Sequence, residues 1–328
     1  MKLVCITACL FMIFACGEKP QKKAKELSVD ELYKKYPDSV PIIIQHGNAM
    51  INRYDFEKAM NDGAKAYRMQ PSNLEARLLY ANALNNRAER TVTDIQTAQT
   101  HFKFIVKKQP KNTKALVSLA TTYAQLGDYD KAFQYTNEAL RVDKHYRDAY
   151  ILKGTIYLSM NKRDLAKSSY QTAIEQDPDF FEAYLKLGVI YQEEKNPVCI
   201  EYYTTATQIR PNSIDALYSL AYAYQELGET EKAKTIYHKM LKKDPSFVTS
   251  SFQLGYIKQF QENDIDSAMI YYKNTLQKEP RFVEAWHNLG VCSELKGEKY
   301  DAVKFYRKAL DYNQDYELSK EALKRLSK

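Results

Sequence analysis

The side chains that could do catalytic or metal-binding chemistry in this sequence are scattered. The five histidines are His46, His101, His145, His238 and His287. None of them pairs with another histidine or with a cysteine at metal-ligand spacing. No Gly-x-Ser-x-Gly motif is present, and no catalytic signature surrounds Cys199. The sequence therefore predicts no metal, no cofactor and no enzymatic activity.

Cys16 is the one residue placed for a defined chemical step, the attachment of a lipid. It follows a 13-residue apolar run, Leu3 to Ala15, which fits a secretory signal and is too short for the roughly 20 residues of a spanning helix. The end of the run, Ile13-Phe14-Ala15-Cys16, resembles the lipobox of bacterial lipoproteins, in which the cysteine becomes the acylated first residue. Cys9 ends a similar tetrapeptide, but only Leu3 to Ala8 precede it.

This resemblance implies a signal peptide at residues 1–15, then an acylated Cys16 and a polar tether to residue 39. We expect one or two helical turns within the tether, at Asp30 to Tyr36. Gly17 is compatible with sorting to the outer membrane, and no acidic run follows Cys16. The predicted location is the cell envelope, lipid-anchored, at an outer membrane and facing the periplasm.

The rest of the chain repeats about every 34 residues. A proline, or the residue in its place, closes each block, and successive closers are 39, 34, 34, 33, 34, 35 and 34 residues apart. The closers are Pro71, Pro110, Lys144, Pro178, Pro211, Pro245, Pro280 and Gln314. Such a period is typical of stacked helical hairpins. The first spacing adds five residues, which we place between two helices, around Asn85 to Thr97.

Small residues recur at fixed offsets inside the blocks. One stands twelve residues before every closer: Ala59, Ala98, Ala132, Ala166, Cys199, Ala233, Ala268 and Ala302. Glycine or alanine also recurs near the middle of each predicted first helix, and tyrosine recurs in the second helix of the last five blocks, at Tyr170, Tyr203, Tyr237, Tyr272 and Tyr306. Small side chains allow two helices to approach closely, and the tyrosines fill the adjoining space.

These offsets resemble the tetratricopeptide repeat family, most clearly from Glu284-Ala-Trp-His-Asn-Leu-Gly290 to Leu310. The resemblance covers Val40 to about Gln314. It implies an all-α, right-handed superhelical solenoid of eight hairpins over residues 40–316. Residues 317–328 are the predicted capping helix, with Leu318, Ala322 and Leu326 on its covering face.

Glycine and cysteine usage agrees with a repeat scaffold. Gly47, Gly154, Gly188, Gly255 and Gly290 take the close-packing position, and the other glycines lie in turns, in a second helix or after Cys16, so none remains for a phosphate-binding loop. Cys199 and Cys292 are nearly three repeats apart and are predicted to be buried free thiols.

The composition suits a helical protein with a solvated surface. The chain is 45% hydrophobic and 27% charged, and its formal net charge is +7 from 48 basic and 41 acidic residues. Because the lysines and glutamates are spread over helix faces, we favour a solvated surface over a polyanion site and expect no nucleic acid.

The first helices carry a second stripe of residues besides the core positions, spaced i, i+4, i+8. In the tetratricopeptide family this stripe lines the concave groove in which peptides lie. Candidate partner-binding residues on it are Asn48, Asn82, Tyr218, Tyr222, Phe252, Tyr256, Phe260 and His287. Aromatic residues of this kind dominate binding hot spots. The alternative is that they only fill the gap between successive first helices.

The sequence thus favours a non-enzymatic adaptor that holds a partner protein or peptide near a bacterial membrane. One alternative is a cell-wall or glycan-binding lipoprotein, with tyrosines stacked on sugar rings. Another is an accessory subunit of a secretion, pilus or outer-membrane assembly complex.

Overall fold

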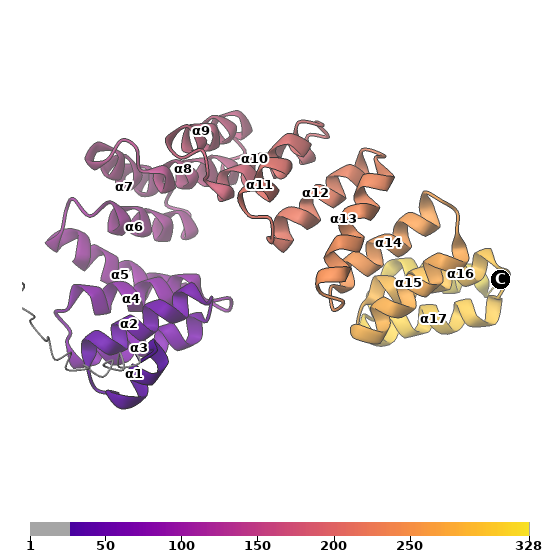
Figure 1. Cartoon of the computed structure of the whole chain (residues 1–328), viewed down its shortest axis with the longest axis horizontal. Coiled ribbons are helices and arrows are strands. Elements are labelled where there is room, and N and C mark those ends of the chain that lie inside the picture. The colour runs from indigo at the N-terminus through magenta and orange to yellow at the C-terminus, as the bar shows by residue number, and fades with distance from the viewer. Residues whose placement is uncertain (1–26, 328) are drawn as a thin grey trace, which may run out of the picture. The chain divides into compact units, whose positions relative to one another are not determined.

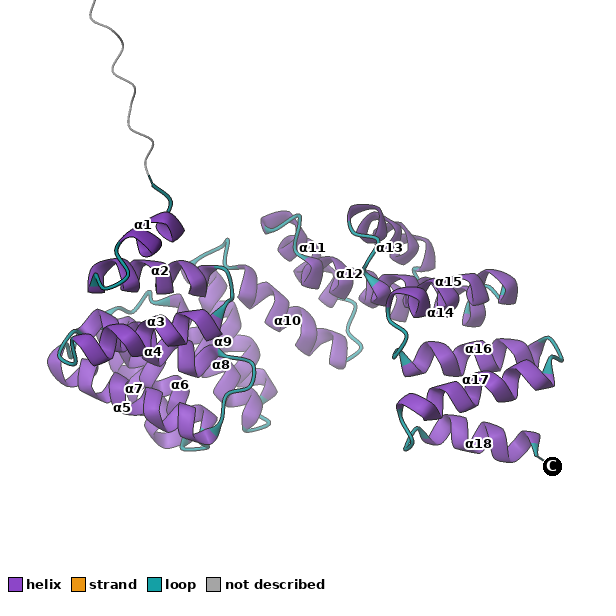
Figure 2. Cartoon of the chain, turned by 90° about the horizontal axis from the view of Figure 1, so that it is seen from below, coloured by secondary structure: helices purple, strands orange, loops and turns teal. Residues whose placement is uncertain are grey.

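The computed structural model describes residues 27–327, which form eighteen α-helices and no strand (Figures 1 and 2). The predicted Cys16 and the signal peptide lie outside the described residues. The helices are α1 Val29–Lys35, α2 Val40–Asn52, α3 Phe56–Met69, α4 Leu74–Asn86, α5 Val92–Lys108, α6 Thr113–Gln125, α7 Tyr129–Val142, α8 Arg147–Ser159, α9 Arg163–Gln176, α10 Phe181–Glu193, α11 Cys199–Ile209, α12 Ile214–Glu226, α13 Thr230–Lys243, α14 Val248–Phe260, α15 Ile265–Lys278, α16 Val283–Leu295, α17 Lys299–Tyr312 and α18 Glu317–Leu326.

From α2 to α17 the helices pair into eight hairpins, in agreement with the predicted fold class. The described chain divides into two compact units, with the boundary in the sequence between Ile105 and Val106. We call residues 27–105 unit 1 and residues 106–327 unit 2.

Short polar side chains begin many of the helices. Asp55, Asp128 and Asp264 accept hydrogen bonds from the backbone N–H groups three residues on, at the starts of α3, α7 and α15. Asn112 does the same for α6. These caps satisfy donors that the first helical turn leaves free.

The turn inside most hairpins needs one residue in the left-handed region. Gly127, Gly228 and Gly297 occupy it with φ of 80°, 77° and 79°, as glycine does at little steric cost. Four other hairpins place a larger residue there, among them Tyr54 with φ 60° and Lys195 with φ 54°.

Glycine in the first helix makes room for the tyrosine of the second. A Cβ atom added at Gly188 would lie 2.4 Å from Cε1 of Tyr203, and one added at Gly290 would lie 2.5 Å from Cε1 of Tyr306. The same close approach pairs Gly154 with Tyr170 and Gly255 with Tyr272. The small residues before the closers are all buried, as predicted.

Helix α1, where helical turns were expected, packs against α2 within unit 1. Its Tyr33 ring stacks on His46 of α2, with the centroids 4.1 Å apart, and Asp30 pairs with Arg53 at 3.0 Å. His46 Nδ1 also lies 2.6 Å from Oδ2 of the buried Asp62. Ile44 has the spacing of the groove stripe, but it is buried in a core cluster against which Tyr33 packs.

The added residues of the second hairpin are shared between a turn and a helix. The turn runs over residues 87–91, and α5 has 17 residues where α3 has 14. Arg87 holds this turn with its guanidinium 3.4 Å from Glu57 and 3.8 Å from Asp94.

Helix α18 covers the end of unit 2 with Ala322 and Leu326 as predicted, but Leu318 is not part of the covering face. Ser319 and Ala322 are buried, while Leu318 is 55% exposed. Ser319 follows Ala285 by one repeat and takes the same buried small-residue position. Leu318 therefore corresponds to Glu284 and is turned away from the covering face.

Candidate binding groove

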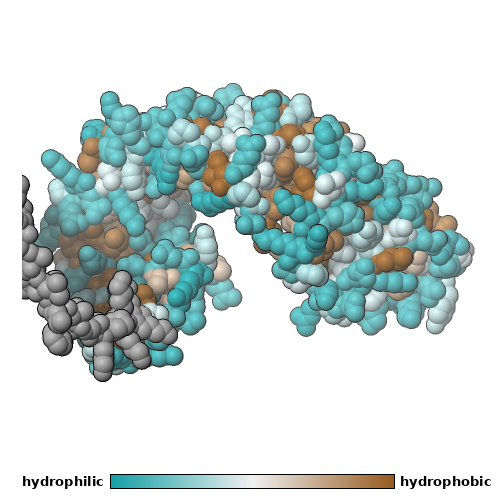
Figure 3. Space-filling model, in the orientation of Figure 1, coloured by the Kyte–Doolittle hydropathy of each residue, from teal (hydrophilic) through white to brown (hydrophobic). Residues whose placement is uncertain are grey.

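An open groove in unit 2 lies across α12, α14 and α16, the first helices of three successive hairpins, and the start of α18. Its volume is about 790 Å³. It is lined by Tyr222, Gln225, Glu226, Phe252, Gln253, Tyr256, Phe260, Gln261, Glu284, His287, Asn288, Val291, Tyr316 and Leu318. We call it the aromatic groove. The space-filling view shows hydrophobic residues in separate clusters on a mostly hydrophilic surface, including clusters along unit 2 (Figure 3).

Two aromatic rings of α14 form an exposed part of its wall. Tyr256 and Phe260 lie one helical turn apart, with ring centroids 4.5 Å from each other. Tyr256 is 37% exposed and Phe260 is 54% exposed. Two adjoining rings that keep this much surface in water form a preformed apolar contact site on a rigid helix.

Amides connect the groove wall to the core behind it. Gln225 Nε2 donates to Gln253 Oε1 at 3.0 Å, and Gln253 Nε2 donates to the Tyr218 hydroxyl at 3.1 Å. Asn288 Nδ2 donates to the Tyr272 hydroxyl at 3.2 Å. These bonds fix the orientation of side chains at the groove floor.

His287 is held at the end of the groove next to α18. Its Nδ1 lies 3.0 Å from the Ser319 hydroxyl, and its ring packs against Tyr306 and Tyr316. Burial and the positive charge of Arg325 lower the pKa of His287, against a smaller opposite effect of Glu294. The imidazole is therefore mainly neutral at pH 7.

Five of the predicted partner-binding residues come together here: Tyr222, Phe252, Tyr256, Phe260 and His287. The alternative that the aromatics fill space fits part of the stripe. Tyr218 stands behind the wall, stacked on Tyr222 and packed beside Tyr237. Phe252 lines the groove but also packs against Tyr272 and Phe282.

The two predicted asparagines belong to unit 1. Asn48 is exposed on α2, and Asn82 is half-buried on α4, where its carbonyl oxygen accepts a bond from Asn86 Nδ2. They are not part of the aromatic groove.

Sequence reasoning missed several groove residues, among them Glu284, Tyr316 and Leu318. Glu284 and Leu318 each precede a buried small residue, Ala285 and Ser319. Continuing the repeat register into α18 would have identified Leu318.

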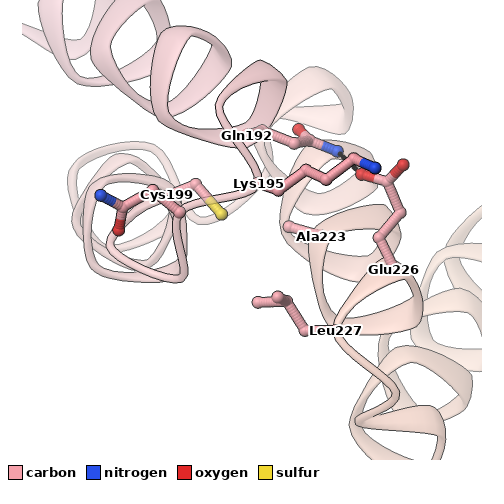
Figure 4. A pocket seen from close by; sticks show the side chains of 7 residues that line it. Gln192, Lys195, Cys199, Ala223, Glu226 and Leu227 are labelled. Carbon is pink, nitrogen blue, oxygen red and sulfur yellow. Dashed lines mark hydrogen bonds between the residues drawn. The ribbon is translucent and has the colours of Figure 1, made fainter.

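A smaller pocket of about 270 Å³ lies next to the groove (Figure 4). It forms where α11 has only 11 residues, and it is lined by Gln192, Lys195, Asn196, Cys199, Ala223, Glu226 and Leu227. Gln192 Nε2 donates to Glu226 at 2.6 Å across its rim. Cys199 is 2% exposed, and burial raises the pKa of its thiol, which disfavours the reactive thiolate.

No group of three or more potential metal ligands occurs among residues 27–327. Within the same range, no helix has the length and apolar character needed to cross a bilayer. Cys199 and Cys292 are both buried and free, as predicted.

Comparison with known families agrees with this geometry. Tetratricopeptide repeat family models match residues 87–146, 154–195, 215–246 and 283–316, together just over half of the chain.

Individual relatives are distant and longer. Human protein O-mannosyl-transferase TMTC3 is 23% identical over 233 residues, which are 66% of this chain and 26% of that protein. Anaphase-promoting complex subunit 3 of Schizosaccharomyces pombe is 19% identical over 213 residues, or 65% of this chain and 31% of that protein. The chain thus spans only about a quarter to a third of the length of these relatives.

Solved structures share the fold. The human IFIT1 dimer with m7Gppp-AAAA aligns with a TM-score of 0.57 at 18% identity, over 88% of this chain and 76% of that one. The Cut9–Hcn1 hetero-tetramer of the anaphase-promoting complex aligns with a TM-score of 0.57 at 16% identity, over 92% of this chain and 58% of that one. At these identities the likeness extends to the fold alone.

Proposed function

The chain is a tetratricopeptide repeat protein, and on this premise we propose that it is a non-enzymatic adaptor that holds a segment of a partner protein in the aromatic groove. The observation that carries the proposal is the exposed Tyr256–Phe260 pair on α14, with Leu318 exposed on the same groove. Apolar rings of this kind lose contact with water when a partner segment covers them.

The groove is poorly suited to a polyanion. Its charged lining residues are Glu226 and Glu284, and among the residues that line it there is no Lys or Arg. Phosphate groups would meet these carboxylates without a cation to offset the repulsion. A protein segment therefore fits the surface better than a nucleic acid.

We further propose that the adaptor is anchored in a bacterial envelope by acylation of Cys16, at the periplasmic face of the outer membrane. The support is the apolar run Leu3 to Ala15 before Cys16 and the polar segment after it. An anchored groove would concentrate a partner near the membrane surface.

The groove is tested by site-specific crosslinking in intact cells. A photoreactive benzoylphenylalanine replaces Phe260 in the groove, and in the control it replaces Tyr300, which is 83% exposed on α17 and lines no part of the groove. Discrete protein adducts are expected from position 260 and not from position 300. Adducts to glycan instead of protein at position 260 would favour a cell-wall binder.

A double variant supplies the energetic test. Tyr256→Ala with Phe260→Ala should weaken capture of the crosslinked partner by about thirtyfold for each truncated ring, because a truncated aromatic anchor costs about 2 kcal/mol. Helix content by circular dichroism should remain that of the unmodified protein. Unchanged capture by the folded double variant would reject the groove as the binding site.

The anchor is tested separately by labelling cells with a palmitate analogue. Incorporation and membrane fractionation should be lost in Cys16→Ser and retained in Cys9→Ser. Retention of the label in Cys16→Ser would show that the lipid is attached elsewhere.

A further inference from the structure

The charge of the aromatic groove is opposite in sign to that of the whole chain. The chain has a formal net charge of +7, but the charged residues that line the groove are two glutamates. His287 adds no full positive charge at neutral pH, because burial lowers its pKa. The groove is therefore an acidic, aromatic site on a basic protein.

In the described part of the chain, neither groove carboxylate forms an ion pair, although Lys195 lines the smaller pocket together with Glu226. Within residues 27–327, neither Glu226 nor Glu284 has a Lys, Arg or His side chain within ion-pair distance, and the Gln192 amide that donates to Glu226 is neutral. Nearby glutamates differ. Glu294 pairs with Arg325 at 2.6 Å, and Glu262 pairs with both Lys234 and Lys258 at 2.6 Å.

The unpaired carboxylates flank the exposed rings. Glu226 comes from α12, the first helix of the hairpin before α14, and Glu284 comes from α16, the first helix of the hairpin after it. Tyr256 and Phe260 lie on α14 between them in the repeat order. Glu226 is also one helical turn from Tyr222, and burial together with this carboxylate raises the pKa of the Tyr222 hydroxyl.

This arrangement matches a basic side chain next to an apolar one. A lysine or arginine can lay its aliphatic stem on an aromatic ring and place its charge at a carboxylate. The faces of tyrosine and phenylalanine attract the same cation. An acidic side chain would meet unfavourable charge from either glutamate.

We propose that the aromatic groove selects a protein segment in which lysine or arginine side chains adjoin aliphatic or aromatic ones, with cations held by Glu226 and Glu284 on either side of the Tyr256–Phe260 pair. This proposal rests on the proposed function, since it names the chemistry of the partner at the same groove. The preference for cations can nevertheless fail while the groove remains a binding site.

The first experiment selects peptide ligands for the groove from random sequences. The full chain, immobilised, is panned with a random dodecapeptide phage library, and the Tyr256→Ala, Phe260→Ala double variant removes phage that bind elsewhere. We expect enriched sequences that combine Lys or Arg with apolar residues. Enrichment of acidic or uncharged sequences would overturn the cation preference but keep the groove function. If no peptide depends on Tyr256 and Phe260, the groove function itself is rejected.

The second experiment measures the contribution of each carboxylate. An enriched basic peptide and its copy with Gln at every Lys and Arg are compared by fluorescence anisotropy. Glu226→Gln with Glu284→Gln should lower the affinity for the basic peptide about tenfold and leave the affinity for the Gln copy unchanged. Each ion pair between a groove glutamate and the peptide near the surface contributes up to about a fivefold effect on affinity.

Controls separate this local effect from the general charge of the protein. Glu175→Gln, an exposed site on α9 outside the groove, should change the affinity of neither peptide. Raising the salt concentration should lower the affinity for the basic peptide and leave the affinity for the Gln copy unchanged. If Glu175→Gln lowers the affinity for the basic peptide as much as Glu226→Gln with Glu284→Gln does, the attraction is non-specific and the proposal is overturned.

Discussion

Tyr237 and Gln225, a lining residue of the groove, are both buried, and the Tyr237 hydroxyl does not pair with the Gln225 side-chain oxygen. In the described structure, neither the Tyr237 hydroxyl nor the Gln225 Oε1 atom has a hydrogen-bond partner. The corresponding tyrosines of neighbouring hairpins are bonded: Tyr203 donates to Gln192 at 2.8 Å and Tyr272 donates to Gln259 at 2.7 Å. The hairpin of Tyr237 differs by having Ala221 where those hairpins have Gly188 and Gly255.

The extra methyl group of Ala221 gives a physical reason for the lost bond. In the glycine-containing hairpins, a Cβ atom would come within 2.4 to 2.8 Å of the tyrosine ring. The Tyr237 ring must therefore sit differently beside α12. Since an unpaired buried hydroxyl carries a desolvation cost with no compensating bond, its removal should be harmless.

We predict that Tyr237→Phe leaves the free energy of unfolding unchanged or raises it slightly. Tyr272→Phe, the matched control, should lower it by about 1–3 kcal/mol, because it leaves Gln259 without its donor. Urea denaturation followed by circular dichroism measures the stability of each variant, and hydrogen exchange of α13 and α15 shows which hairpin is affected. Equal destabilisation by both changes would mean that Tyr237 does have a partner in solution.

Gly188→Leu should destabilise its hairpin by about 1–3 kcal/mol, because the added side chain enters the space of the Tyr203 ring. Hydrogen exchange should rise first in α10 and α11, since repeats contact mainly their neighbours. Combining Gly188→Leu with Tyr203→Ala should cost less than the sum of the two single changes. Strict additivity would show that the two residues are not in contact.

Backbone strain at Tyr54 should be removable. Tyr54 adopts φ 60° and is 79% exposed, in the turn position that Gly127 takes with φ 80°. Tyr54→Gly is expected to stabilise unit 1 by up to about 1 kcal/mol. The change removes the cost of a left-handed backbone at a non-glycine residue, and the greater freedom of glycine in the unfolded chain offsets part of that gain.

The reverse change provides the control for that prediction. A Cβ atom at Gly127 would meet no atom within 4 Å, so Gly127→Ala tests the backbone alone and should destabilise unit 2 by about 1 kcal/mol. Hydrogen exchange of α2, α3, α6 and α7 measures both effects. A neutral Gly127→Ala would remove the basis for the Tyr54 prediction.

The stability of unit 1 should fall as the pH is lowered from about 6.5 to 4. His101 is buried beside Tyr67 and Tyr80, and burial, with the positive charge of Arg77, lowers its pKa from 6.5 to about 4. Within this range the unfolded chain binds a proton at His101 and the folded chain does not, so protonation favours unfolding.

Replacing the imidazole isolates this effect. His101→Phe should unfold with about 2 kcal/mol less pH dependence between pH 7.5 and 5 than the unmodified protein, as measured by hydrogen exchange of α5. Other titrating groups act alike in both proteins and cancel in the comparison. The same pH dependence in both would place the His101 pKa near its ordinary value in the folded state.

The hairpins could be predicted from sequence because their contacts recur at short, constant separations. Gly188 meets Tyr203 fifteen residues later, and Gly290 meets Tyr306 sixteen residues later. A repeated pair at such a spacing predicts both helices and their packing. The stripe that holds Tyr222, Tyr256 and Phe260 could also be predicted, because the 3.6-residue period of an α-helix determines which of its side chains share a face.

Whether a side chain of that stripe is exposed depends on the helices and side chains packed around it, which the helical period does not specify. Ile44 has the spacing of a groove residue, but α1 packs against its cluster and it is buried. Tyr218 has the same spacing as Phe252, but it stands behind the groove wall, where it stacks on Tyr222.

By itself, the sequence determined an all-helical array of tetratricopeptide hairpins and the face on which its aromatic residues would gather. Only the tertiary structure showed that Glu226, Glu284 and Leu318 join Tyr256 and Phe260 around one groove. Those residues belong to different hairpins, so their proximity depends on how successive hairpins pack. That packing is the sum of many weak contacts between side chains far apart in the sequence, and no short-range pattern records it.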